Sequence, residues 1–371
     1  MTRPRMILMM GWLALALARP AAADDTDAVA DSVLAGLDLR ARVGQMLVVY
    51  RAANEVLLPE DFGGVLLFSS MLADTAALRA DLRALQAASA VPLLVCLDQE
   101  GGAVSRLDAA PGQAGAWPGA ATMGTWPPHR IEEEGRRVGQ ALAALGVNVN
   151  LAPVLDSSVT WDGVESWMGH RGRAFGPGDR TIVPAAAAFA RGCRQAGVAC
   201  IGKHFPGYDV AGNTDEELQT SGAGAEAVAA GAARFAAAAG ALDGVMMASI
   251  IYDAAGPDPA VMTTSLVTAA RARPGQVVMT DDLWAHSLRH WGRPDLTIER
   301  AHYPDADWAR LGGLALAAGN DLLLVTYPAK AAELRDHLVD LAARERWARR
   351  RVDAAAGRIL RLKARLGLLS R

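Results

Sequence analysis

The chain has 371 residues, 51% of them hydrophobic, and its 37 lysines and arginines nearly balance 40 aspartates and glutamates for a net charge of −3. This length is ample for a large core, and it fits one large α/β barrel or two ordinary domains. A mildly acidic balance gives no electrostatic basis for binding nucleic acid, so we expect no nucleic-acid partner.

Residues 1–23 have the pattern of a secretory signal peptide. Arg3 and Arg5 give a positive start, the apolar stretch 6–18 follows, and three alanines then offer a cleavage site. The apolar stretch is short for a bilayer span, although retention as an uncleaved anchor is the alternative. We therefore expect an exported protein, periplasmic or secreted, whose folded unit is 24–371 and which makes no stable membrane insertion after cleavage.

Eight short apolar runs recur along the rest of the chain. They are 45–50, 64–68, 92–97, 147–153, 198–202, 244–251, 276–279 and 321–326. Because the runs are continuously apolar rather than alternating, they favour parallel strands that are buried on both faces. Segments of helical period are predicted between them at 75–87, 130–145, 183–195 and 225–239, with a final one at 349–366.

Eight such strand–helix units favour a single closed (β/α)8 barrel of the TIM type with a C-terminal helix, rather than an open doubly wound sheet. No linker or change in composition marks a second domain. No Gly-x-Gly-x-x-Gly follows the first predicted strand, which argues against a dinucleotide fold. We expect neither a cofactor nor a metal site, because no histidines and cysteines have ligand spacing.

The three cysteines are Cys96, Cys193 and Cys200. Export would permit a disulfide, and Cys193 and Cys200 are the only pair of cysteines that lie close together in sequence. We favour the interpretation that all three are small buried apolar residues.

Polar residues follow four of the predicted strands, and in a barrel such residues share the face that carries the active site. They are Asp98, Glu100 and Arg106, then Asp156, Arg171 and Arg173, then Lys203 and His204, and finally Asp281 and Asp282. Any one of them could be a helix cap or a salt bridge at the rim. Together they predict a polar pocket for a polyhydroxylated ligand.

Five tryptophans fall in the loops on the same face, at positions 117, 126, 161, 167 and 284. An indole ring offers a flat apolar surface for the C–H face of a sugar. Alternatively, these rings cap the mouth of the barrel.

Six sequence stretches occur in order over nearly the whole of 24–371. They are Asp98-Gln99-Glu100-Gly101-Gly102, Ala152-Pro153-Val154-Leu155-Asp156, Arg173-Ala174-Phe175-Gly176, Lys203-His204-Phe205-Pro206-Gly207, Thr280-Asp281-Asp282-Leu283 and Arg358-Ile359-Leu360 with Leu362-Lys363. In these stretches the chain resembles the catalytic barrel of family 3 glycoside hydrolases, and among them the single-domain bacterial β-N-acetylglucosaminidases. The resemblance implies a carbohydrate substrate, namely terminal β-N-acetylhexosamine in cell-wall (peptidoglycan) fragments.

The resemblance also implies a role for each matching residue. The groups that bind the hydroxyls of the sugar being cleaved would be Asp98, Arg106, Arg173, Lys203 and His204. Asp281 would attack the anomeric carbon to form the covalent glycosyl-enzyme of a retaining glycosidase. Lys203 would help keep Asp281 ionised, and Asp282 would make structural hydrogen bonds.

The loop after Gly207 departs from the family. Its N-acetylglucosaminidases carry Asp-Ser-His there, and that histidine serves as general acid and base. Here the next histidine after His204 is His286. Asp215 is the first candidate for a replacement proton donor, followed by Glu216 and Glu217, since carboxylic acids are the usual donors in glycosidases. These acids could instead be the acidic start of a helix.

Three functions therefore remain open. The first is an exported retaining β-glycosidase with a carboxylic acid in place of the histidine. The second is a non-hydrolytic descendant that only binds sugar, and the third is a β-glucosidase-like enzyme. The loops 157–171 and 284–310 also differ from the family and would border the site. The intact nucleophile stretch favours a hydrolase. The oligomeric state is left open.

Overall fold

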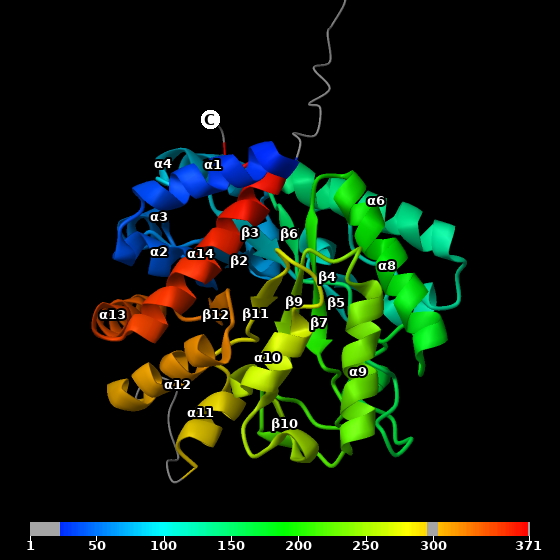
Figure 1. The fold of residues 1–371 in the computed structure, drawn as a ribbon. Coiled ribbons are helices and arrows are strands. Elements are labelled where there is room, and N and C mark those ends of the chain that lie inside the picture. Colours follow the sequence, from blue (N-terminus) through cyan, green and yellow to red (C-terminus); the bar gives the residue numbers. More distant parts are fainter. Residues whose placement is uncertain (1–22, 295–302, 370–371) are drawn as a thin grey trace, which may run out of the picture.

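The computed structural model describes residues 23–294 and 303–369, and it shows eight parallel strands in one sheet of order β11-β9-β7-β6-β3-β2-β1-β12. The strands are β1 Leu47–Tyr50, β2 Gly64–Leu67, β3 Leu94–Leu97, β6 Val149–Asn150, β7 Ala199–Phe205, β9 Gly244–Met247, β11 Val277–Met279 and β12 Leu323–Val325. A parallel bridge between Met279 and Leu322 connects the two ends of this order. The sheet thus curls into a barrel with helices around it (Figure 1), which confirms the predicted (β/α)8 fold with a C-terminal helix.

The larger helices follow the strands around the barrel. They are α1 Ala23–Gly36, α2 Leu39–Gln45, α4 Thr75–Ala88, α6 Pro128–Leu145, α8 Asp179–Gln195, α9 Ala225–Ala238, α10 Thr264–Ala270, α11 His286–Gly292, α12 Asp305–Ala318, α13 Pro328–Arg344 and α14 Arg346–Arg365. Short helices lie at α3 Asn54–Leu57, α5 Ala120–Met123 and α7 Trp167–His170. The predicted helices are all present, with bounds that differ by a few residues.

Local sequence explains why these helices form and pack as they do. In α4 the Asp74 side chain caps the first turn, and leucines at helical spacing face the core. Between α6 and α8, Gly135 and Gly192 allow close contact of the two backbones, because a Cβ at either position would lie 2.2 Å or less from a carbonyl oxygen of the other helix.

The strand predictions need correction at three places. The fifth strand does not end at residue 202 but continues to Phe205, so Lys203 and His204 are part of β7. The fourth contains only Val149–Asn150. The run 244–251 divides into β9 and β10 (Ile250–Tyr252), and β10 pairs with β8 (Gln219–Ser221) in a separate two-stranded sheet.

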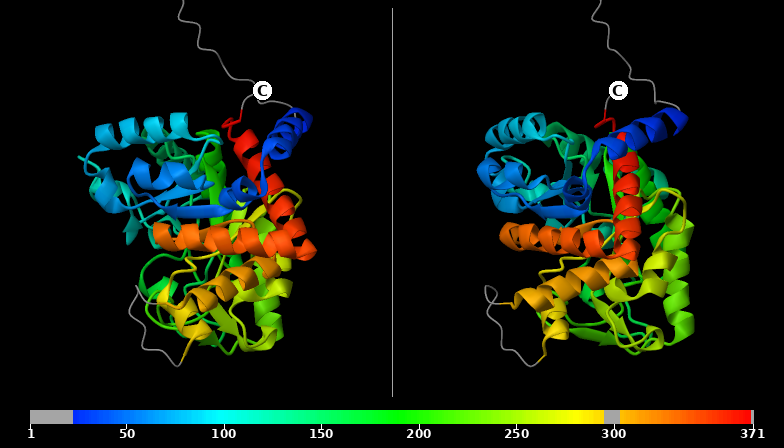
Figure 2. Two further views of the ribbon diagram at one scale, coloured as in Figure 1. Left: turned by 90° about the vertical axis from the view of Figure 1, so that its left-hand side faces the viewer. Right: turned by 60° about the vertical axis from the view of Figure 1, so that its left-hand side comes forward.

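The C-terminal helix packs against the N-terminal part of the chain. Figure 2 shows α1 and α14 side by side, and Arg361 of α14 bonds Asp31 of α1 at 2.7 Å.

The cysteines are buried free thiols, as we interpreted them. Within residues 23–294 and 303–369 no helix is long and apolar enough to cross a bilayer. The predicted signal peptide lies, apart from Ala23, outside the described residues and stays a prediction.

Candidate active site

A pocket of about 910 Å³ opens at the carboxyl ends of the barrel strands. The residues predicted for catalysis or sugar binding all line it, namely Asp98, Arg106, Arg173, Lys203, His204, Asp215 and Asp281. These residues are far apart in sequence, and they meet because the ends of parallel barrel strands converge on one face. The pocket is thus the position at which TIM-type barrels carry their chemistry.

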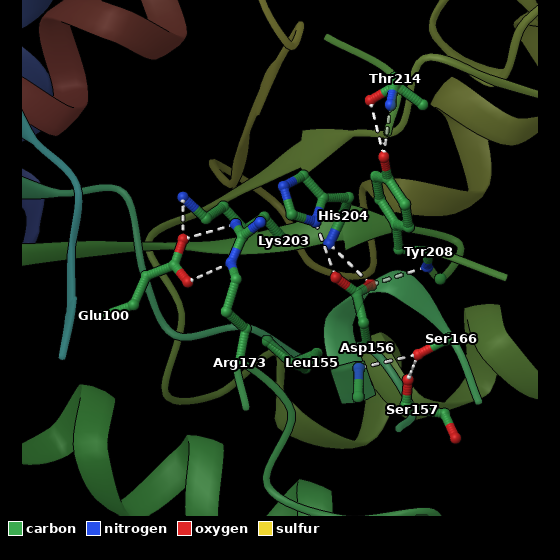
Figure 3. A network of polar contacts seen from close by, with 12 residues as sticks. Glu100, Leu155, Asp156, Ser157, Ser166, Arg173, Lys203, His204, Tyr208 and Thr214 are labelled. Atoms are coloured by element: carbon green, nitrogen blue, oxygen red, sulfur yellow. Dashed lines mark hydrogen bonds and ion pairs between the residues drawn. The ribbon is translucent and has the colours of Figure 1, made fainter. Parts of the chain in front are cut away.

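A buried carboxylate, Glu100, organises the cationic side of the pocket. Glu100 lies in the short strand β4 (Gln99–Gly101), and both oxygens accept hydrogen bonds of 2.8 Å from the Arg173 guanidinium. The Lys203 ammonium lies 2.7 Å from Glu100 (Figure 3). It also lies 2.6 Å from Asp98. Arg106 is more distant, with a nitrogen 3.9 Å from Asp98.

These contacts explain how charged groups remain ionised in a buried place. Burial by itself would raise the pKa of Glu100, but Lys203 and Arg173 hold it well below its usual range. Burial would likewise lower the pKa of Lys203, and Asp98 and Glu100 raise it instead. The sequence places Glu100 among the polar residues of the predicted pocket, but its pairing with both Lys203 and Arg173 is visible only in the structure.

A second buried carboxylate, Asp156, orients His204. One Asp156 oxygen lies 2.7 Å from His204 Nδ1, and the other accepts the backbone N–H groups of His204 at 3.0 Å and Tyr208 at 2.8 Å (Figure 3). Asp156 is completely buried. Within the part of the chain that the structure describes, His204 Nε2 has no hydrogen-bond partner, so this nitrogen is available to a ligand in the pocket.

The two aspartates that follow β11 have different surroundings. Asp281 lines the pocket, and among the described residues its carboxylate accepts a hydrogen bond only from the Asp282 backbone N–H, at 2.8 Å. Asp282 accepts bonds from the Thr326 hydroxyl at 2.6 Å and from the Trp284 N–H at 3.0 Å. Burial raises the pKa of Asp282 to about 6. Asp282 therefore connects β11 to the end of β12, as expected, and Asp281 remains available for chemistry.

The loop after β7 presents only one of the three candidate proton donors to the pocket. Glu216 accepts a bond from Asn213 at 3.0 Å and Glu217 from Gln219 at 2.7 Å, and neither lines the pocket. Asp215 does line it. The Asp215 residue is exposed to solvent, yet partial desolvation on its pocket side and then the charge of Asp281 raise the pKa of its carboxyl.

The alternative interpretation of these acids, as the start of a helix, is wrong. Residues 214–216 form a turn, and the next element is strand β8, with α9 beginning only at Ala225. Of the three acids, the turn brings only Asp215 to the pocket lining.

The prediction of a tryptophan surface for the sugar is wrong for this pocket, because none of the five tryptophans lines it. Arginine side chains cover Trp117 and Trp126, and Trp284 is fully buried against Trp308. Trp161 is 56% exposed but borders a neighbouring cavity of about 220 Å³. The aromatic residues of the pocket are instead Tyr50, Phe68, Tyr208 and Tyr327. Arg171 also lies outside the pocket, with its guanidinium 5.7 Å from the Trp167 ring.

Comparison with known proteins agrees with this geometry. A sequence model described as the glycosyl hydrolase family 3 N-terminal domain matches residues 38–362. A β-hexosaminidase of Vibrio cholerae serotype O1 is 32% identical over 298 residues, which are 77% of this chain and 82% of that protein. A crystal structure of a β-N-acetylhexosaminidase from Beutenbergia cavernae has 32% identity and a TM-score of 0.76, and the match covers 89% of this chain and 99% of the other.

A second solved structure has a similar barrel. It is a glycoside hydrolase family 3 β-N-acetylglucosaminidase from a Paenibacillus species, with 27% identity and a TM-score of 0.77. The match covers 90% of this chain and 63% of that chain, so the other protein is longer.

Proposed function

The chain belongs to glycosyl hydrolase family 3, and from this premise we propose that it is an exported retaining β-glycosidase that releases terminal β-N-acetylhexosamine. The hexosaminidase activity in the names of its relatives supports this class of substrate. The observation that carries the proposal is that Asp281 and Asp215 line one pocket together with a complete set of predicted sugar-binding groups. The predicted signal peptide supports export, and with it a substrate from the cell wall.

In the first step the Asp281 carboxylate attacks the anomeric carbon. A bond forms from Asp281 to that carbon while the glycosidic C–O bond breaks, and its electron pair leaves with the oxygen of the leaving group. Asp215 supplies the proton that neutralises this oxygen. A raised pKa keeps a larger fraction of Asp215 protonated, as a general acid requires.

In the second step water releases the sugar. Asp215, now ionised, removes a proton from a water molecule, whose oxygen attacks the anomeric carbon and breaks the ester bond to Asp281. The products are the free sugar, with its configuration retained, and the original carboxylate of Asp281.

The ion pairs of the pocket hold the sugar during both steps. Asp98 and Lys203 offer an acceptor and a donor next to each other, and His204 Nε2 offers a third group at fixed orientation. Glu100 already holds Lys203 in place, and Asp156 holds His204. These side chains therefore need to move little when the hydroxyl groups of the sugar bind.

The missing loop histidine favours a second candidate, a protein that binds the sugar without hydrolysing it. Turnover separates the two. We expect the chain without residues 1–23 to release 4-nitrophenol from the N-acetyl-β-glucosaminide faster than from the β-glucoside, because the relatives act on hexosamines. An activated leaving group requires little protonation, so this assay tests Asp281 independently of Asp215.

The matched controls are Asp281→Ala, which should lose the release, and Glu216→Gln, which should keep it because Glu216 does not line the pocket. A folded protein that releases nothing from either glycoside would favour the binding function. Faster release from the β-glucoside would contradict the hexosamine preference and favour the glucosidase-like alternative.

A further inference from the structure

Tyr208 occupies a central place between the sugar-binding residues and the acid loop. It begins the loop that departs from the family, and only 4% of it is exposed. Its backbone N–H donates to Asp156, the carboxylate that also orients His204. Its ring contacts the His204 ring edge to face, with the centroids 5.4 Å apart. Tyr208 is therefore fixed at both its backbone and its ring.

The phenol oxygen of Tyr208 carries three hydrogen bonds to the far side of the same loop. The Thr214 backbone N–H donates to it at 2.6 Å, and the Thr214 hydroxyl lies 3.0 Å away (Figure 3). The Gly212 carbonyl lies 3.2 Å away. A hydroxyl accepts two hydrogen bonds and donates one, so all three contacts can form together. Thr214 is also buried, with 4% exposed.

The residue after Thr214 is Asp215, which lines the same pocket as Asp281. The Thr214 N–H belongs to the peptide unit that joins Asn213 to Thr214, one residue before Asp215. Because the Thr214 backbone and side chain both bond Tyr208, the direction in which the Asp215 side chain leaves the backbone is restricted. The other anchor of Asp215 is a longer bond, of 3.1 Å, from its own N–H to the half-buried Asn213 side chain.

We propose that Tyr208 is a positioning residue for proton transfer: its hydroxyl fixes Thr214 and so holds the Asp215 carboxyl in the pocket. This inference rests on the proposed function, because it assigns Asp215 as the proton donor. Burial raises the pKa of Tyr208 to about 12, so the phenol stays protonated and keeps its bond to Gly212 across the pH range of an assay.

The test compares aryl N-acetyl-β-glucosaminides whose leaving groups differ in their need for a proton. Tyr208→Phe keeps the ring beside His204 and removes only the hydroxyl. We expect its kcat/KM to fall about 10-fold or more for a 4-methoxyphenyl glycoside, a part of the roughly 10²- to 10⁴-fold that a general acid contributes. For the 2,4-dinitrophenyl glycoside, which needs no acid, kcat/KM should stay within about threefold of wild type.

Tyr252→Phe is the matched control. Tyr252 is also buried, with 2% exposed, and its hydroxyl bonds the carbonyl of Gly207 at the start of the same loop, not Thr214. Its loss should affect both glycosides equally. Thr214→Val removes the threonine hydroxyl but keeps the backbone N–H, so it should give a smaller loss with the same selectivity, and it tests the inference independently should Tyr208→Phe fail to fold.

The outcomes separate this inference from the function on which it rests. If kcat/KM in Tyr208→Phe falls equally for both glycosides, or does not fall, the positioning role is overturned. The proposed function stays intact in that case if kcat/KM in Asp215→Ala still falls mainly for the glycoside with the poor leaving group. A folded wild type that turns over neither glycoside would overturn both.

Discussion

The ammonium of Lys203 lies 2.7 Å from Oε1 of Glu100, and only 4% and 2% of the two side chains are exposed. Glu100 also pairs with Arg173, so a single carboxylate balances two cations, with Asp98 as the other acid bonded to Lys203. Removing one partner of a buried ion pair leaves an uncompensated charge, which is far more costly than losing a pair at the surface. This contact therefore affects both folding and the binding of sugar.

Glu100→Gln should lower the free energy of unfolding by about 3 to 5 kcal/mol. The substitution removes the carboxylate that pairs with both Arg173 and Lys203, and Asp98 then remains as the acid bonded to Lys203. Urea denaturation measures the change. The control is Glu132→Gln, which removes an exposed pair with Arg191 and should cost less than about 1 kcal/mol. Equal costs in the two variants would contradict the role of Glu100.

Asp281 should carry the sugar in a covalent intermediate. A 5-fluoro N-acetylglucosaminyl fluoride should inactivate the enzyme and add its sugar mass to the peptide that contains Asp281. Asp281→Ala should lower turnover of the 4-nitrophenyl glycoside on the order of 10³-fold or more and should not be labelled. Labelling of a different carboxylate would reassign the nucleophile.

Asp215 should act as the general acid and base. Asp215→Ala should slow hydrolysis of glycosides with poor leaving groups by about 10²- to 10⁴-fold, while an activated aryl glycoside is glycosylated at nearly the normal rate. Glu217→Gln is the matched control, because Glu217 bonds Gln219 and does not line the pocket. Losses in Asp215→Ala that do not depend on the leaving group would exclude this role.

Lys363 should make the stability of the fold depend on pH. This side chain is fully buried in α14, donates to Gln45 at 2.6 Å, and has a pKa that burial lowers to about 7. Unfolded lysine titrates near 10.4, so between these values the unfolded chain binds one more proton and stability rises with pH. From pH 7.5 to 9 the free energy of unfolding should rise by about 2 kcal/mol relative to that of Lys363→Met, since one proton corresponds to roughly 1.4 kcal/mol per pH unit.

Chemical denaturation of both proteins at several pH values measures this difference. Subtracting the values for Lys363→Met from those for wild type removes the pH dependence that comes from groups which titrate alike in both proteins. Parallel curves for wild type and Lys363→Met would show that the ammonium stays charged in the folded protein.

The sequence by itself determined the barrel and the group of residues at its mouth. Continuous apolar runs such as 64–68 and 276–279 indicate strands that are covered on both faces, and eight of them in one chain favour a closed sheet with helices outside. Once the strands are parallel, residues at their carboxyl ends must meet, so Asp98 and Asp281 share a pocket although 182 positions separate them.

Only the tertiary structure decided which neighbours each side chain has. Apolarity ended the predicted fifth strand at residue 202, but β7 continues because Asp98, Glu100 and Asp156 neutralise or bind the polar residues at its end. Trp117 and Trp126 lie under arginines and Trp284 lies in the core, whereas Asp215 lines the pocket from a turn whose first residue, Thr214, bonds Tyr208. Such contacts depend on the distances between residues far apart in the chain, which local propensity and periodicity do not encode.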